Sequence, residues 1–87
     1  MSAVQAVGVK QTVRDFILRS VPIKKLEDDD DLFASGIVNS LFAVQLMTFV
    51  EKAFSIDVDV DDLDIANFKS LNATTAFVLR KNGQLNG

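Results

Sequence analysis

Hydrophobic residues near the start of the chain recur at steps of three and four. This spacing places them on one face of a helix, which we predict over residues 9–21. Pro22 lacks an amide hydrogen and restricts the residue before it, so the helix should end near Ser20 or Val21. The apolar face consists of Val9, Val13, Phe16, Ile17 and Val21.

Residues 23–39 have no single periodicity. The acid run Glu27–Asp31 is followed by the apolar pair Leu32-Phe33 and then by Gly36, so apolar residues alternate with charges and a helix breaker. Long ordered loops of this kind often carry function. The pattern predicts a long loop pinned to a hydrophobic core.

A second helix is expected from Ser40 to about Phe54. Asn39 can cap it, because its side-chain oxygen can accept a hydrogen bond from an amide of the first turn. Leu41 and Val44 fall on the polar side, and Phe42 either lies at the surface or folds back toward Phe49 as part of the core. The inward face should comprise Ala43, Leu46, Met47, Val50 and Phe54.

In the last third of the chain, apolar residues first alternate with aspartates, and a helical spacing then returns. Ile56, Val58 and Val60 alternate with aspartates, and because no partner strand is evident we expect an extended loop. Residues 61–67 should form a short third helix and residues 71–81 a final one, ended by Asn82-Gly83. The packed side of that final helix should include Ala73, Ala76, Phe77 and either Leu79 or Arg80.

These elements predict an all-α fold, a small four-helix bundle with a long first loop and a short third helix. The 87 residues suffice for one domain, with a core at about residues 9–81 and flexible ends. Hydrophobic residues make up 48% of the chain and charged residues 24%, which suits a folded globular protein.

Charge and hydropathy narrow the classes of partner. The 12 acidic and 9 basic residues give a net charge of −3, which argues against a nucleic-acid partner and favours basic protein partners. No segment approaches the roughly 20 apolar residues of a membrane span, and no signal peptide is evident. We therefore expect a cytoplasmic protein, acting as a monomer.

The residue types exclude much catalytic chemistry. Histidine and cysteine are both absent, so a serine-histidine triad, a cysteine nucleophile and a zinc site of the usual ligands are excluded. Asp57, Asp59 and Asp61 imitate a calcium loop, but Asp62 stands where that loop needs glycine and Phe68 where it needs glutamate. The acid run fits a solvated loop, or a surface that attracts basic enzymes, better than a metal cluster. We expect a protein that is not an enzyme and holds no metal.

Leu32-Phe33, Gly36, Asn39-Ser40-Leu41 and the helix to Phe54 together resemble the acyl and peptidyl carrier protein family, whose attachment site is a Ser-Leu pair just after an acidic or polar residue. The resemblance covers roughly Val9 to Lys81. It implies that a phosphopantetheinyl transferase uses coenzyme A to esterify Ser40 with phosphopantetheine, on which acyl groups ride as thioesters. By position alone, Ser40 could instead merely assist Asn39 in capping.

Partner enzymes should recognise the surface around Ser40. This surface departs from the family pattern at two positions. Asn39 replaces the usual aspartate, and Phe42 lies where many members carry an acid. The residues that we expect to contact partners are Asn39, Leu41, Phe42, Val44, Gln45 and Glu51.

Residues 36–46 are also similar to discrete carriers of glycerate-derived units, such as those that mature to methoxymalonyl extenders in polyketide assembly. This similarity implies partners that act in trans: an acyl-loading enzyme, tailoring dehydrogenases and synthase modules. The alternatives are a carrier for fatty acid synthesis, an aminoacyl or peptidyl carrier, and a non-catalytic helical interaction module.

Overall fold

The computed structural model describes residues 6–34, 36 and 38–86, with side chains up to residue 83. Its elements are, in chain order, α1 (Ala6–Ser20), α2 (Ser40–Phe54), the 3₁₀ turn η1 (Val60–Asp62), α3 (Ile65–Phe68) and α4 (Leu71–Asn86). Within these residues the protein has four α-helices and no strand, so the predicted all-α bundle with a long first loop and a short third helix is confirmed. The ends that we expected to be flexible include residues 1–5 and 87, which lie outside the described part.

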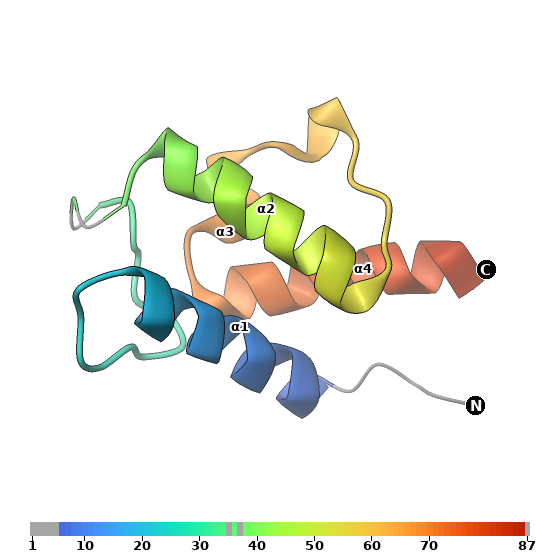
Figure 1. Ribbon diagram of the computed structural model, residues 1–87. Helices are drawn as coiled ribbons and strands as arrows, with labels where there is room; N and C mark the ends of the chain where they lie inside the picture. The colour runs from blue at the N-terminus through green and yellow to red at the C-terminus, as the bar shows by residue number, and fades with distance from the viewer. Residues whose placement is uncertain (1–5, 35, 37, 87) are drawn as a thin grey trace.

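Helix α1 packs against α4, and α2 passes in front of α4 (Figure 1). The short α3 contacts both α2 and α4 and so joins the two halves of the bundle. The start of α1 and the end of α4 lie at the same end of the molecule, while the long first loop turns at the opposite end (Figure 1). Ser40 is therefore presented at the end of the bundle away from the chain termini.

The core faces of α1 and α2 follow the predicted periodicity. Val13 and Ile17 of α1 and Leu46 and Val50 of α2 are each 0% exposed. Helix α1 begins at Ala6, earlier than predicted, and ends at Ser20 before Pro22 as expected. Met47 and Phe54 of α2 are only partly buried, at the edge of the core.

The third helix is shorter than predicted and is divided in two. Residues 61–67 were expected to be one helix, but η1 ends at Asp62 and α3 begins at Ile65. Asp64 separates them: its backbone is extended, and its carboxylate accepts a hydrogen bond from the Ala66 amide at 2.9 Å. An aspartate in this conformation caps a new helix rather than continuing the old one.

Helix α4 differs from its prediction in length and in its packed face. It continues through Asn82-Gly83 to Asn86, because Gly83 does not adopt the positive φ that would end a helix. Ala76 is exposed, contrary to the prediction, and of the two alternatives Leu79 and Arg80 it is Leu79 that packs partly against the core. The buried face instead includes Leu71, Thr74, Thr75, Phe77 and Val78. Thr74 is tolerated there because its hydroxyl donates to the Ser70 carbonyl at 2.9 Å.

The long first loop is pinned to the core and to two helices. Leu26, Leu32 and Val38 are buried, and the Leu32 amide donates to the Lys69 carbonyl at 2.8 Å. At the acid run, the Asn72 amide at the start of α4 donates to the Asp28 carbonyl at 3.0 Å. The described part of the loop is therefore pinned to the core and to its neighbouring helices, as the sequence predicted.

Candidate functional site

Ser40 is the first residue of α2 and is exposed. Just before it, Asn39 has an extended backbone, and its Oδ1 accepts a hydrogen bond from the Phe42 amide at 3.2 Å. Asn39 alone provides this side-chain cap, and within the described structure the Ser40 hydroxyl makes no hydrogen bond. The hydroxyl is therefore free to be modified without loss of the cap.

The electrostatics at this helix start favour a bound phosphate. The first turn of α2 contains no acidic residue, and the first amides of a helix point outward with the positive end of its dipole. A phosphodiester on Ser40 would thus meet amide hydrogens and no neighbouring carboxylate from its own turn. The residues present fit the attachment of phosphopantetheine at this position.

A cleft of about 480 Å³ opens beside Ser40. Ala43 and Val44 of α2 form one wall, and residues of the segment from η1 to α3 form the other, namely Asp61, Leu63, Asp64 and Ile65. Leu63 is 44% exposed and Ile65 46%, which are high values for apolar side chains. An arm attached to Ser40 could lie against this apolar surface, where it would cover area that is now in contact with water.

Two aspartates, Asp61 and Asp64, line the cleft, and three more lie in the same segment of the chain. Lys81 from α4 pairs with Asp62 at 2.8 Å and lies 3.9 Å from Asp59. The hydrogen bond from Lys81, aided by one from the Asp59 amide, lowers the pKa of Asp62. Asp62 is therefore held ionised and tied to α4, and Asp61 and Asp64 supply the negative charge of the cleft itself.

The residues expected to contact partners occupy different environments. Leu41, Val44 and Gln45 are exposed on the outer face of α2, and Leu41 is 64% exposed. Asn39 is also exposed but is engaged as the cap. Glu51 is half-buried, and its carboxylate accepts a hydrogen bond from the Val58 amide at 3.3 Å.

Phe42 lies in the core and is 7% exposed. Its ring stacks with that of Phe16, with centroids 6.1 Å apart, and Phe16 in turn stacks with Phe49 at 4.2 Å. Of the two positions considered from the sequence, the core position is therefore the one observed. Residue 42 supports the helix that presents Ser40.

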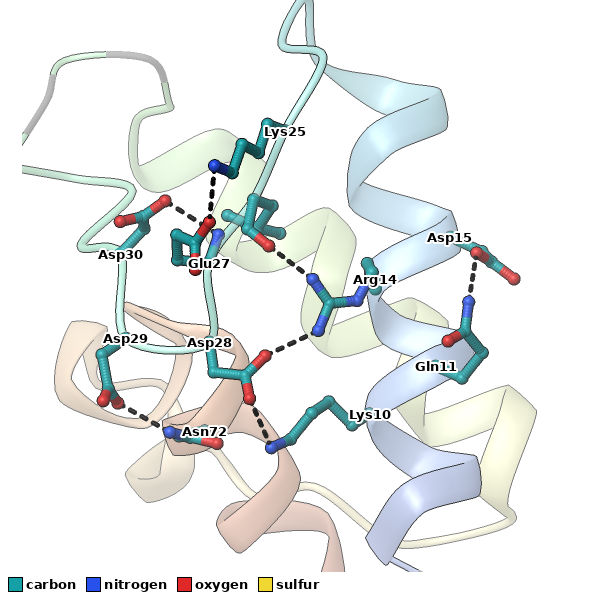
Figure 2. Close-up of polar contacts among 11 residues, drawn as sticks. Lys10, Gln11, Arg14, Asp15, Lys25, Glu27, Asp28, Asp29, Asp30 and Asn72 are labelled. Carbon is teal, nitrogen blue, oxygen red and sulfur yellow. Dashed lines mark hydrogen bonds and ion pairs between the residues drawn. The ribbon is translucent and has the colours of Figure 1, made fainter.

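The acid run is engaged throughout in contacts that hold the first loop. Asp28 lies between two cations of α1, 2.9 Å from Lys10 and 2.6 Å from Arg14, and Arg14 also donates to the Leu26 carbonyl (Figure 2). Asp29 accepts from the Asn72 side chain at 2.7 Å, and Glu27 pairs with Lys25 at 3.1 Å. The remaining two aspartates accept from loop amides. The run has a structural role that the sequence pattern did not suggest.

The residues that sequence reasoning missed are those of the second wall, Leu63, Asp64 and Ile65. Their only signal was the presence of apolar residues in an otherwise acidic stretch. Among the described residues, no group of three or more His, Cys, Asp or Glu side chains could hold a metal ion. In the same part of the chain, no helix is both long and apolar enough to cross a bilayer.

Comparison with known families gives one match. The sequence model of the phosphopantetheine attachment site family matches residues 8–78, which include all of α2 and α3 and most of α1. A search of curated proteins found no match. Domains of this family attach phosphopantetheine covalently and generally act as non-catalytic carriers for partner enzymes. Because the match covers most of the chain and the fold is the expected helical bundle, this protein belongs to the phosphopantetheine attachment site family.

Proposed function

We propose that this protein is a discrete acyl carrier protein that holds its cargo as a thioester on phosphopantetheine attached to Ser40. The observation that carries the proposal is the exposed serine at the start of α2, inside a chain that matches the carrier family over residues 8–78. The unbonded hydroxyl and the free amides of the first turn support the same residue.

The chemistry required of this chain is modest. A phosphopantetheinyl transferase would join the Ser40 oxygen to the phosphopantetheine phosphate of coenzyme A, the serine would lose its proton, and adenosine bisphosphate would leave. The transferase supplies the base and the chain supplies an exposed hydroxyl, so the lack of histidine is compatible with this role. The amides of α2 would stabilise the bound phosphodiester by about 0.3 to 1 kcal/mol.

Intact-mass measurement tests the site. Incubation with coenzyme A and a phosphopantetheinyl transferase should add one phosphopantetheine to the chain and none to Ser40→Ala. Ser20→Ala is the matched control, since Ser20 is exposed but ends α1, and it should be modified like the parent. A modification that persists in Ser40→Ala would refute the assignment, and a helical circular dichroism spectrum would exclude misfolding.

For the cargo, we propose a three-carbon glycerate-derived unit used as a polyketide extender. The resemblance of residues 36–46 supports it. In this proposal the partners are a glyceryl-loading enzyme, tailoring dehydrogenases and synthase modules, which reach a monomeric carrier in trans in the cytoplasm.

The cargo is tested by offering the modified protein a glyceryl-activating enzyme and, separately, a malonyl transferase of fatty acid synthesis. Mass spectrometry of the thioester should show glyceryl loading. Exclusive malonyl loading would favour a carrier for fatty acid synthesis, and an aminoacyl thioester formed by an amino-acid-activating enzyme would favour a peptidyl carrier. Failure to accept any phosphopantetheine would favour a non-catalytic interaction module.

A further inference from the structure

A second hollow lies on the other side of α2, between that helix and α1. It encloses about 760 Å³ and does not include Ser40. Its lining includes Phe16 and Ser20 from α1 and Val44, Thr48, Phe49 and Lys52 from α2. We call it the α1–α2 groove.

The floor of the α1–α2 groove is aromatic. The rings of Phe16 and Phe49 lie 4.2 Å apart and 15° from parallel, and both side chains are only partly buried. Phe42 supports Phe16 from the core side. Covering apolar surface that is in contact with water favours association.

The rim of the groove is positively charged. Lys52 lines it, and the Arg19 guanidinium lies 5.8 Å from the centroid of the Phe16 ring. Neither cation is within ion-pair distance of a carboxylate in the described residues, whereas Lys10, Arg14, Lys25 and Lys81 are all paired. The nearest acids in sequence are engaged elsewhere: Asp15 accepts from Gln11, and Glu51 accepts from the Val58 amide.

This charge is opposite to that of the molecule as a whole. The net charge is −3, and the segment between α2 and α3 contributes five aspartates on the other side of α2. A basic partner would be drawn to those aspartates, and a partner that fits the groove needs acidic groups beside apolar ones.

We propose that the α1–α2 groove binds an acidic amphipathic helix of a partner protein. Apolar side chains spaced at i, i+3, i+4 and i+7 would cover Phe16 and Phe49, and flanking Asp or Glu residues would pair with Arg19 and Lys52. The proposal deepens the carrier function by naming a partner surface, and in its biological meaning it rests on that function. It can nevertheless be tested without the arm.

Two other occupants fit the groove less well. A symmetric dimer through this surface would bring the Arg19 and Lys52 side chains of both copies together, and like charges across an interface oppose association. An anionic membrane would be attracted by the two cations but repelled by the net charge of −3. An acidic helix avoids both kinds of repulsion, because it brings negative charges to the two cations and presents no extended anionic surface to the rest of the molecule.

The probe is a fluorescent synthetic amphipathic helix with leucines at the four spaced positions and glutamates flanking them, together with a twin in which lysines replace the glutamates. Binding to the full chain carrying Ser40→Ala is measured by anisotropy at low salt. We expect the acidic peptide to bind about tenfold more tightly than its twin, and we expect this preference to shrink as salt rises.

Variants locate the binding. Lys52→Glu should weaken the acidic peptide about tenfold, since it replaces attraction with repulsion, and Thr48→Glu in the groove wall should act in the same direction. Lys69→Glu is the matched control, because Lys69 is an exposed lysine at the end of α3 outside the groove. It should change the affinity by less than about twofold. Circular dichroism checks that each variant folds.

The proposal is overturned if the two peptides bind equally, if the acidic peptide does not bind, or if Lys69→Glu weakens binding as much as Lys52→Glu. It is also overturned if the chain prefers anionic vesicles, or if it forms dimers that Lys52→Glu dissolves. If the peptide binds but no transferase modifies the parent chain with Ser40 intact, the carrier function alone is refuted. If the parent chain is modified normally but the acidic peptide does not bind, the groove proposal alone is refuted.

Discussion

At the scale of single residues, Asn39 decides how Ser40 is presented. Its Oδ1 accepts the Phe42 amide at 3.2 Å, and this bond fixes the first turn of α2 while leaving the Ser40 hydroxyl exposed. The cap and the proposed attachment site are therefore adjacent residues with separate tasks. A carrier needs both, because the arm must leave the helix in a defined direction.

Asn39→Asp should leave the free energy of unfolding within about 1 kcal/mol of the parent, because Asn and Asp cap helices about equally well. It should also quicken modification by a generic phosphopantetheinyl transferase, since it places a carboxylate before the serine, as in the carrier pattern that the sequence resembles. Urea unfolding and a time course of intact mass measure the two effects. Asn39→Ala, the control without a cap, should lose about 0.5 to 2 kcal/mol. Equal modification rates for the parent and the Asn39→Asp variant would remove the charge argument.

At the scale of elements, the end of α2 is as well defined as its start. Ser55 follows the helix with φ of 53°, in the left-handed region, and the next amide, that of Ile56, donates to the Glu51 carbonyl at 3.2 Å. A residue other than glycine is disfavoured there, because its Cβ crowds the following carbonyl. This strained conformation at Ser55 turns the chain out of α2 and into the acidic segment that forms the second wall of the cleft.

Ser55→Gly should therefore raise the free energy of unfolding by roughly 0.5 to 1 kcal/mol, since glycine adopts this conformation without the steric cost. Urea unfolding followed by circular dichroism measures it. Ala53→Gly is the matched control in the regular part of α2, where the same new residue should lower stability by about 1 kcal/mol. If both variants are destabilised alike, the left-handed turn carries no strain.

At the scale of the whole molecule, Asp28 joins three parts of the fold. Its carboxylate pairs with two cations of α1 (Figure 2), and its carbonyl accepts a hydrogen bond from the backbone amide of Asn72 in α4. The hydrogen bond from Lys10, followed by that from Arg14, lowers the pKa of Asp28. A carboxyl group with a lowered pKa contributes stability at neutral pH, and this contribution is lost as the pH falls through the native-state pKa.

We expect the parent to lose stability in acid and Asp28→Asn to lose less of it. The variant should be less stable than the parent at neutral pH. The gap should narrow as the pH falls below about 4, where the aspartate of the unfolded chain takes up a proton, and then through the lower native-state pKa. Urea unfolding across this range measures the gap. Asp57→Asn is the control, because Asp57 is exposed and has no ion pair in the described structure. A gap for Asp28→Asn that does not change with pH would contradict the ion-pair explanation.

Much of the fold was predictable from the sequence because the deciding interactions are local. Helical periodicity predicted the core faces of α1 and α2. Pro22 predicted the end of the first helix, and Asn39 predicted the cap before Ser40. The errors in α4 arose where periodicity was weak, since threonines contribute to the buried face and Gly83 continues the helix.

Only the tertiary structure decided what surrounds Ser40. The cleft needs Leu63 and Ile65 beside α2, and the α1–α2 groove needs Phe16 beside Phe49, pairs of residues that are brought together by packing of separate helices. The acid run reads as surface charge in the sequence, yet Asp28 and Asp29 find partners in α1 and α4. Sequence periodicity defines the face of each helix, but contacts between elements depend on how those faces meet, and local spacing does not encode that.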